Sequence, residues 1–141
     1  GSAFKPFVYL AALENGFTPA SIIPDAPIDV YQGPGLPLWS PKNYGGDFLG
    51  PMSLRSALEK SRNLVTVRIE IAKRFGIGDN IRNMFSSVLG TGEVTLLNLT
   101  NAYGIIANGG IRIEPIMIEK IQDRYGKIIY KSENKICEGC N

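Results

Sequence analysis

GSAFKPF, residues 1–7, opens the chain and places a serine and a lysine three positions apart. In a helix, residues i and i+3 lie on one face, so the amine of Lys5 can reach the hydroxyl of Ser2. A serine nucleophile needs a base to take its proton. The sequence contains no histidine, which excludes a Ser-His-Asp triad within this chain and leaves Lys5 as the candidate base. The pair by itself is weak evidence, because a capping serine beside a solvated lysine shows the same spacing.

The composition is that of one ordinary globular domain: 141 residues, of which 44% are hydrophobic and 20% charged. A net charge of +2 is too small to indicate a nucleic-acid partner. No apolar run is long enough to span a bilayer. Without histidine, Cys137 and Cys140 do not complete a tetrahedral zinc site, and we predict neither a metal ion nor a cofactor. The two cysteines are expected to form a small disulfide loop in an oxidising compartment, with redox exchange as the alternative.

Local signals in the first half of the chain predict two helices separated by a long loop. The first covers residues 3–14 with Ser2 at or near its N-cap, where backbone amides favour developing negative charge. The second runs from Ser53 to about Ser61. Residues 17–51 are rich in proline and glycine, which predicts an irregular excursion. Its scattered apolar residues are expected to pack onto the core, namely Ile22, Ile23, Ile28, Leu36, Trp39 and Phe48.

The later segments predict further helices and then strands. Residues 64–75 fit a buried helix and an alternating strand equally well by periodicity. Residues 79–89 are expected to form a short helix, and Thr95 to cap a longer one through Asn108. Finally, the pattern indicates a hairpin of residues 111–122 and 126–131, turning at residues 123–126. Helices first and strands late are typical of an α+β fold.

A second motif, Ser61-Arg62-Asn63, follows the predicted second helix. Alone it is as well explained by a helix end whose polar side chains bind loose backbone groups. Preceded by Ser2, Lys5 and a long loop, it gives an order of motifs that resembles the layout of serine acyl-transferases that act on β-lactams and D-alanyl peptides. The two motifs in this order are therefore stronger evidence for an acyl-transferase site than either motif alone.

The resemblance extends over most of the chain. The sequence closely resembles the transpeptidase domain of penicillin-binding proteins, most of all their class A, bifunctional branch. The stretches that carry it are residues 1–7, 43–46, 50–58, 61–63, 89–95 and 102–110. This resemblance implies a partial penicillin-binding, serine β-lactamase-like fold, in which a mostly helical subdomain precedes a β-hairpin. It also implies that residues 64–75 are helical.

The family's third motif, Lys-Thr-Gly on a strand, does not occur in the sequence. We therefore expect residues 1–141 to be the central part of one transpeptidase domain, incomplete at both ends. An incomplete site predicts that the chain alone is inactive. The apolar surface that absent strands would cover predicts self-association.

The resemblance implies a D-alanyl-D-alanine transpeptidase that crosslinks peptidoglycan stem peptides and is acylated by β-lactams. In that reaction Ser2 is the nucleophile and Lys5 its base, while Ser61 relays a proton and Asn63 binds Lys5 or the substrate amide. The parent protein is expected to be anchored at the extracytoplasmic face of the bacterial membrane by an upstream segment, and to carry a glycosyltransferase domain. The alternatives are a β-lactam sensor, a β-lactamase-like hydrolase or a non-catalytic structural fragment.

Overall fold

The computed structural model describes residues 1–74, 89–90, 92–112 and 114–133. These residues fall into two compact units, Gly1–Gly92 and Glu93–Asn141, and each is described by itself. Apart from its last residue, the helix expected over residues 79–89 lies outside the described residues. Cys137 and Cys140 lie outside them too, so the helix and the disulfide both stay predictions.

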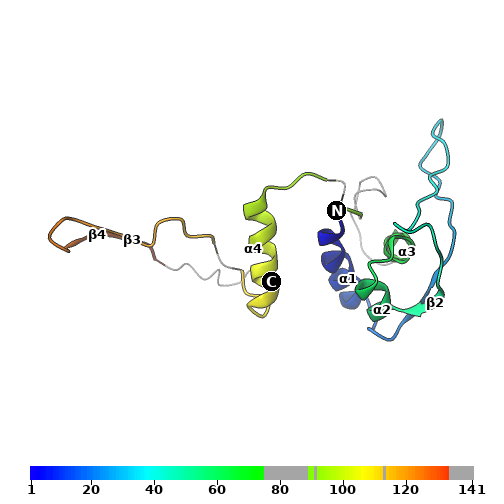
Figure 1. Cartoon of the computed structure of the whole chain (residues 1–141), viewed down its shortest axis with the longest axis horizontal. Coiled ribbons are helices and arrows are strands. Elements are labelled where there is room, and N and C mark those ends of the chain that lie inside the picture. Colours follow the sequence, from blue (N-terminus) through cyan, green and yellow to red (C-terminus); the bar gives the residue numbers. More distant parts are fainter. Residues whose placement is uncertain (75–88, 91, 113, 134–141) are drawn as a thin grey trace. The chain divides into compact units, whose positions relative to one another are not determined.

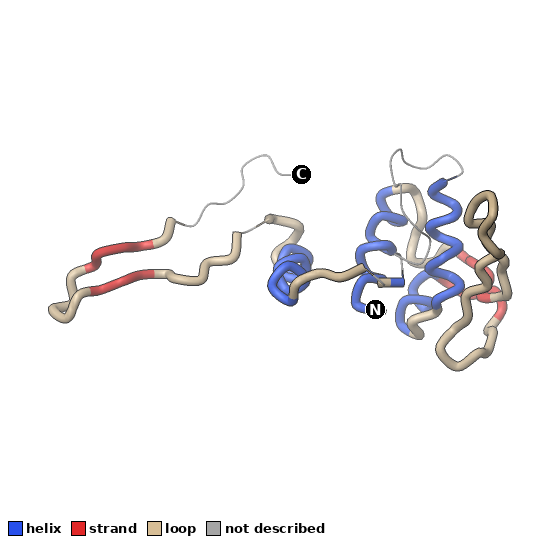
Figure 2. The backbone as a smooth tube through the Cα atoms, turned by 90° about the horizontal axis from the view of Figure 1, so that it is seen from above, coloured by secondary structure: helices blue, strands red, loops and turns tan. Residues whose placement is uncertain are grey.

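The described residues of the first unit form three α-helices: α1 (Lys5–Glu14), α2 (Leu54–Glu59) and α3 (Asn63–Arg74) (Figure 1). A short 3₁₀ turn, η1 (Ser2–Phe4), precedes α1. Pro6 lies in the first turn of α1, where a missing backbone N–H costs no helical bond. Helices α1, α2 and α3 pack against one another, with two short strands beside them (Figure 2). The predicted first two helices are thus confirmed, with α1 starting two residues later than expected.

Helix α3 lies at the centre of this unit. Its residues from Leu64 to Val67, together with Ile69, are fully buried. Around it pack Val8 and Ala12 of α1. A helix that is covered on all sides loses the 3.6-residue apolar period, which explains why its sequence also fitted a strand. The structure confirms the helix.

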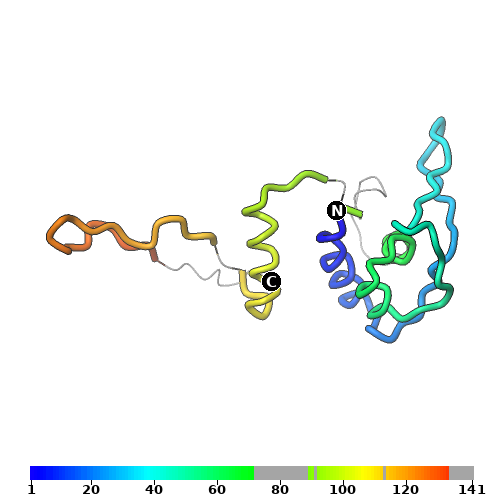
Figure 3. The backbone as a smooth tube through the Cα atoms, viewed as in Figure 1, coloured from blue at the N-terminus to red at the C-terminus, as the bar shows by residue number. Residues whose placement is uncertain are grey.

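The expectation that residues 17–51 are irregular throughout is wrong. Strand β1 (Ile22–Asp25) pairs antiparallel with β2 (Gly50–Ser53), with Ile23 opposite Met52. Between them the chain runs out as a long loop, light blue to cyan in Figure 3, which is pinned by one bridge between Val30 and Trp39. Four-residue strands that contain proline carry little local signal, so their pairing depends on the tertiary fold.

Only part of this segment packs onto the core. Ile23 is buried, and Ile28 and Trp39 pack against the core at its edge. The prediction is wrong for the other three residues, because Ile22, Leu36 and Phe48 are exposed by 64%, 58% and 47%.

The second unit contains α4 (Leu96–Ala107) and a hairpin of β3 (Lys120–Gln122) and β4 (Ile128–Lys131). Thr95 caps α4 by accepting a hydrogen bond from the amide of Asn98 at 3.2 Å, as predicted. The hairpin turn is also confirmed, but its strands are shorter than expected, and the described residues between 111 and 119 form no strand. The α+β class is confirmed.

Candidate active site

Ser2 and Lys5 stand at the junction of η1 and α1, and they differ sharply in exposure. Ser2 is exposed, whereas the side chain of Lys5 is among the largest fully buried ones, at 1% exposure. The N-cap of α1 is Phe4, so Ser2 lies near the N-cap, two residues before it, and is not itself the capping residue. Ser2 instead lies one short turn earlier, within η1, where its hydroxyl is open to a substrate.

The amine of Lys5 is held by the second motif. Its Nζ donates hydrogen bonds to the backbone oxygen of Ser61 at 2.6 Å, to Ser61 Oγ at 2.9 Å and to Asn63 Oδ1 at 2.6 Å. The Ser61 hydroxyl in turn donates to Ser2 Oγ at 3.1 Å. The structure therefore brings together all four residues that the sequence predicted: Ser2, Lys5, Ser61 and Asn63.

The link between nucleophile and base differs from the simplest expectation. Helical spacing predicts direct contact between Ser2 and Lys5, but among the described residues the hydrogen bonds join them through Ser61. Ser61 comes from a segment more than fifty residues away in the sequence, so no local pattern placed it between them.

Burial changes the acidity of Lys5. Desolvation, and secondarily the positive charge of Arg62, lower the pKa of the Lys5 amine from 10.5 to about 8. Both causes act in the same direction, because each disfavours the ammonium form. At neutral pH a useful fraction of this lysine is therefore uncharged and can accept a proton.

A cluster that the sequence did not predict surrounds the middle residue of the second motif, and all its members except Asp47 are buried. We call Asp25, Asn43, Asp47 and Arg62 the clamp. Arg62 binds Asp25 through Nε and Nη2, both at 2.7 Å from Oδ2, and binds Asp47 through Nη1 at 3.2 Å. Asn43 joins the same group by donating to Asp25 Oδ1 at 2.8 Å. Burial opposes ionisation of Asp25, but these bonds and the amide of Leu49 outweigh it and lower the pKa of the carboxyl.

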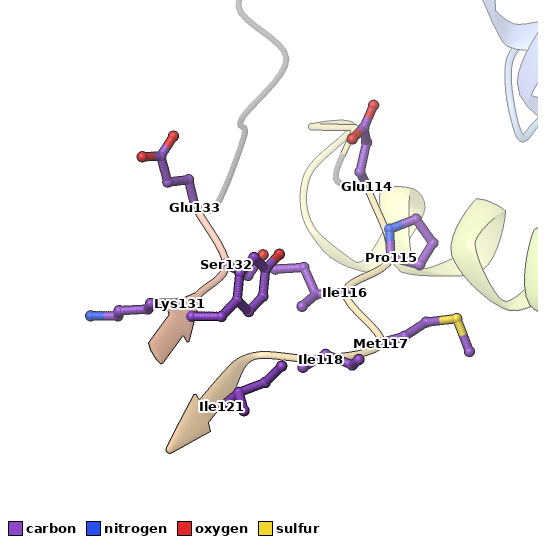
Figure 4. A pocket seen from close by; sticks show the side chains of 10 residues that line it. Glu114, Pro115, Ile116, Met117, Ile118, Ile121, Lys131, Ser132 and Glu133 are labelled. Atoms are coloured by element: carbon purple, nitrogen blue, oxygen red, sulfur yellow. The ribbon is translucent and has the colours of Figure 1, made fainter. Parts of the chain in front are cut away.

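A separate hollow of about 850 Å³ lies in the second unit, between the hairpin and the segment before it. In Figure 4, Ile116 points into the space between the two segments, whereas Met117 and Lys131 point away from it. Its lining offers carboxylates, apolar side chains and one serine, Ser132, with no buried base beside it. The candidate active site is therefore the Ser2 cluster.

Comparison with known proteins agrees with this geometry. The family described as "Penicillin binding protein transpeptidase domain" matches residues 1–88, which include all four site residues. The chain belongs to the penicillin-binding protein transpeptidase family. The resemblance inferred from the sequence is thereby confirmed.

Members of this transpeptidase family match the chain over nearly its whole length. Penicillin-binding protein 1A of Rickettsia bellii (strain RML369-C) is 56% identical over an alignment that covers 100% of this chain and 19% of that protein. The corresponding protein of Pseudomonas aeruginosa is 43% identical, over 94% of this chain and 17% of its own length. The chain thus spans about a fifth of the length of these relatives.

Solved structures of the family share the fold. The crystal structure of penicillin-binding protein 1A from Haemophilus influenzae matches 96% of this chain with a TM-score of 0.82 and 40% identity, and the match covers 22% of that structure. An imipenem acyl-enzyme complex of penicillin-binding protein A from M. tuberculosis matches with a TM-score of 0.78 at 24% identity, covering 96% of this chain and 38% of that one. The second likeness shows the fold alone.

Proposed function

We propose that this chain is the central part of one transpeptidase domain, spanning residues 1–141, and that Ser2 is its acylated residue. The observation that carries the proposal is the hydrogen-bonded series Ser2 Oγ, Ser61 Oγ, Lys5 Nζ, which ends on a buried lysine. An exposed nucleophile joined to a buried base of lowered pKa is the arrangement that acyl transfer requires.

The hydrogen bonds of Lys5 define the path of the proton. Ser61 O and Asn63 Oδ1 only accept, so a neutral Lys5 amine points its two N–H groups at them and keeps its lone pair for the Ser61 hydroxyl. Ser61 then donates to Lys5 and accepts from Ser2. When Lys5 is charged, the direction reverses, and Ser61 donates to Ser2 as in the structure.

This reversal supplies both proton transfers of the reaction. Ser2 Oγ forms a bond to the carbonyl carbon between two D-alanines as its proton passes to Ser61, while the proton of Ser61 passes to Lys5. The C–N bond then breaks, and the reverse transfer through Ser61 protonates the departing D-alanine amine. An amine of a second stem peptide then attacks the acyl carbon and forms the crosslinking amide as the bond from that carbon to Ser2 Oγ breaks. The amine's proton passes through Lys5 and Ser61 to Ser2 Oγ, which restores the free serine. We assign the Ser2 backbone amide as one oxyanion donor.

The same site accounts for the expected partners. A β-lactam offers Ser2 a strained amide, and penicillin-binding protein A from M. tuberculosis forms an acyl-enzyme complex with imipenem. We propose peptidoglycan stem peptides as substrates and the extracytoplasmic face of the bacterial membrane as the location. Within the described part of the chain, no helix has the length and apolar character to cross a membrane.

Labelling the full-length protein that carries this chain with a fluorescent penicillin tests the proposal. Ser2→Ala should abolish labelling. Lys5→Ala and Ser61→Ala should slow acylation by about 10²–10⁴-fold, the usual contribution of a positioned proton acceptor. Label that persists in Ser2→Ala, or that maps by mass spectrometry to another residue, would overturn the assignment.

A further inference from the structure

The second motif has an unusual backbone. Ser61, whose hydroxyl joins Ser2 to Lys5, has φ 52°, and it is the sole non-glycine with positive φ among the described residues. Side chains other than glycine disfavour this left-handed conformation, and such strain persists only where surrounding contacts impose it. Within the turn, the amides of Ser61 and Arg62 donate to the backbone oxygens of Leu58 and Ala57, both at 2.9 Å, so the left-handed residue belongs to a C-terminal cap of α2. This local cap sets the conformation of the turn, but contacts with distant segments set its position relative to Lys5.

Arg62 provides the first restraint on the position of the turn at Ser61. Its neighbours Ser61 and Asn63 both bind Lys5, whereas the Arg62 side chain is 10% exposed and binds the clamp carboxylates. Besides the bonds to Asp25, its Nη2 donates to the backbone oxygen of Asp47 at 2.7 Å. A planar guanidinium with several fixed acceptors restrains both position and rotation. Anchoring this middle residue sets the direction in which its two neighbours project.

Asn43 provides the second restraint on the position of this turn. Its Oδ1 accepts hydrogen bonds from the backbone amides of Asn63 at 2.8 Å and Leu64 at 3.3 Å. A residue of a distant loop thus satisfies the first N–H groups of α3. Its Nδ2 donates to Asp25 Oδ1 at 2.8 Å and to Asp47 O at 2.9 Å. The backbone of the motif and the Arg62 side chain are thus tied to the same buried carboxylate, Asp25.

We propose that Arg62 and Asn43, tied together by Asp25 and Asp47, are positioning residues that hold the turn at Ser61 in place and so align Ser61 and Asn63 on Lys5. This inference rests on the proposed function, because the alignment matters only if Ser2 is acylated through Ser61. The hydrogen bonds of the Arg62 side chain go to Asp25 and Asp47, so it acts on Ser2 through its neighbours in the motif.

The charge of the clamp supports the same role. Arg62 is the charged group that acts on Lys5, after burial itself, to lower its pKa. Asp25 and Asp47 lie behind Arg62 and hold its guanidinium. Loss of the guanidinium would remove a positive charge and leave two carboxylates, so Lys5 would hold its proton to higher pH.

The test compares acylation by a fluorescent penicillin in full-length wild type, Arg62→Gln, Arg62→Lys and Asp47→Ala. Arg55→Gln, an exposed arginine on α2, is the matched control. The labelled amplitude measures the folded, competent fraction, and the saturating rate constant measures chemistry in that fraction. For Arg62→Gln we expect a rate constant lower by about 10²-fold, the usual cost of misplacing catalytic groups, with its pH midpoint moved upward. Arg62→Lys should recover part of the rate, while Arg55→Gln should match wild type.

Three results would count against the inference. A merely structural role predicts a lower amplitude with an unchanged rate constant in Arg62→Gln. If Arg62→Gln does not fold, Asp47→Ala is the deciding variant, because the Asp47 side chain is 54% exposed and its loss leaves the core intact. An unchanged acylation rate constant in Asp47→Ala would overturn the proposal. Equal rates for Arg62→Lys and Arg62→Gln would also oppose it. Absence of label on Ser2 in wild type would instead refute the proposed function.

Discussion

The pH of the medium should control acylation of Ser2 through the protonation of Lys5. Because the neutral amine is the form that accepts a proton, the acylation rate should rise about tenfold per pH unit at low pH and level off above the pKa of Lys5. That pKa is about 8, lowered by burial and then by the charge of Arg62. The rate profile should therefore bend near pH 8.

The size of the effect follows from the two pKa values. With a pKa of about 8, roughly one lysine in ten is neutral at pH 7, against about one in 3,000 for an ordinary lysine. The buried site thus increases the proton-accepting population by about 300-fold. Ser61 Oγ, 2.9 Å from Nζ, is positioned to use this population.

The assay is stopped-flow acylation of the full-length protein by a fluorescent penicillin between about pH 6 and pH 10, with circular dichroism at each pH to confirm folding. Lys127→Gln, which removes an exposed lysine from the hairpin turn, should reproduce the wild-type profile. Ser2→Ala should give no signal at any pH. A flat profile across this range, or a rate that still rises about tenfold per pH unit up to pH 10, would refute the reasoning.

Two other predictions concern stability and the isolated chain. The lowered pKa of Asp25 makes its contribution to stability complete above about pH 4 and lost as the pH falls through the folded-state pKa. Asp25→Asn should therefore weaken that acid dependence and, at pH 7, lower the free energy of unfolding in urea by about 3 kcal/mol. The control Asp47→Asn should lower the free energy of unfolding by less than about 1 kcal/mol, since the Asp47 side chain is 54% exposed. Equal stability of Asp25→Asn and wild type would contradict this account. The isolated 141-residue chain should acylate at least about 10²–10³-fold more slowly than the full-length protein, because the family's third motif supplies an oxyanion donor. It should also self-associate in sedimentation experiments through apolar side chains such as Leu96 and Met117, which are 80% and 88% exposed. A monomer that acylates as fast as the full-length protein would show that the expected slow acylation and the expected self-association are both wrong.

Much of the local structure was determined by the sequence itself. Thr95 caps α4 as predicted, and Ser53, the predicted first residue of the second helix, caps α2, because a capping hydroxyl binds an amide only three residues further along. Gly16, with φ 85°, follows the end of α1 for a similarly local reason. The Ser2 and Lys5 pair was also visible in the sequence, since both residues lie within one short segment.

Tertiary structure decided the features that depend on distant segments. The pairing of β1 with β2 joins strands across the long loop of residues 26–49, and it left no periodic signal in the sequence. Helix α3 was ambiguous until its surroundings were known, because burial on every side removes the pattern that separates helix from strand. The resemblance to a family resolved that ambiguity, but the residues alone did not.

The site shows the same division. The sequence supplied Ser2, Lys5, Ser61 and Asn63, but the hydrogen bond that places Ser61 between nucleophile and base spans 59 positions. Asp25 and Arg62 were not recognised, since a charged residue in a sequence does not reveal whether it is buried or which charge it meets. Burial of both is favourable only when the fold brings them together at 2.7 Å. The local sequence thus determines which side chains are available for the reaction. Their alignment arises from contacts between segments that only the folded chain brings together.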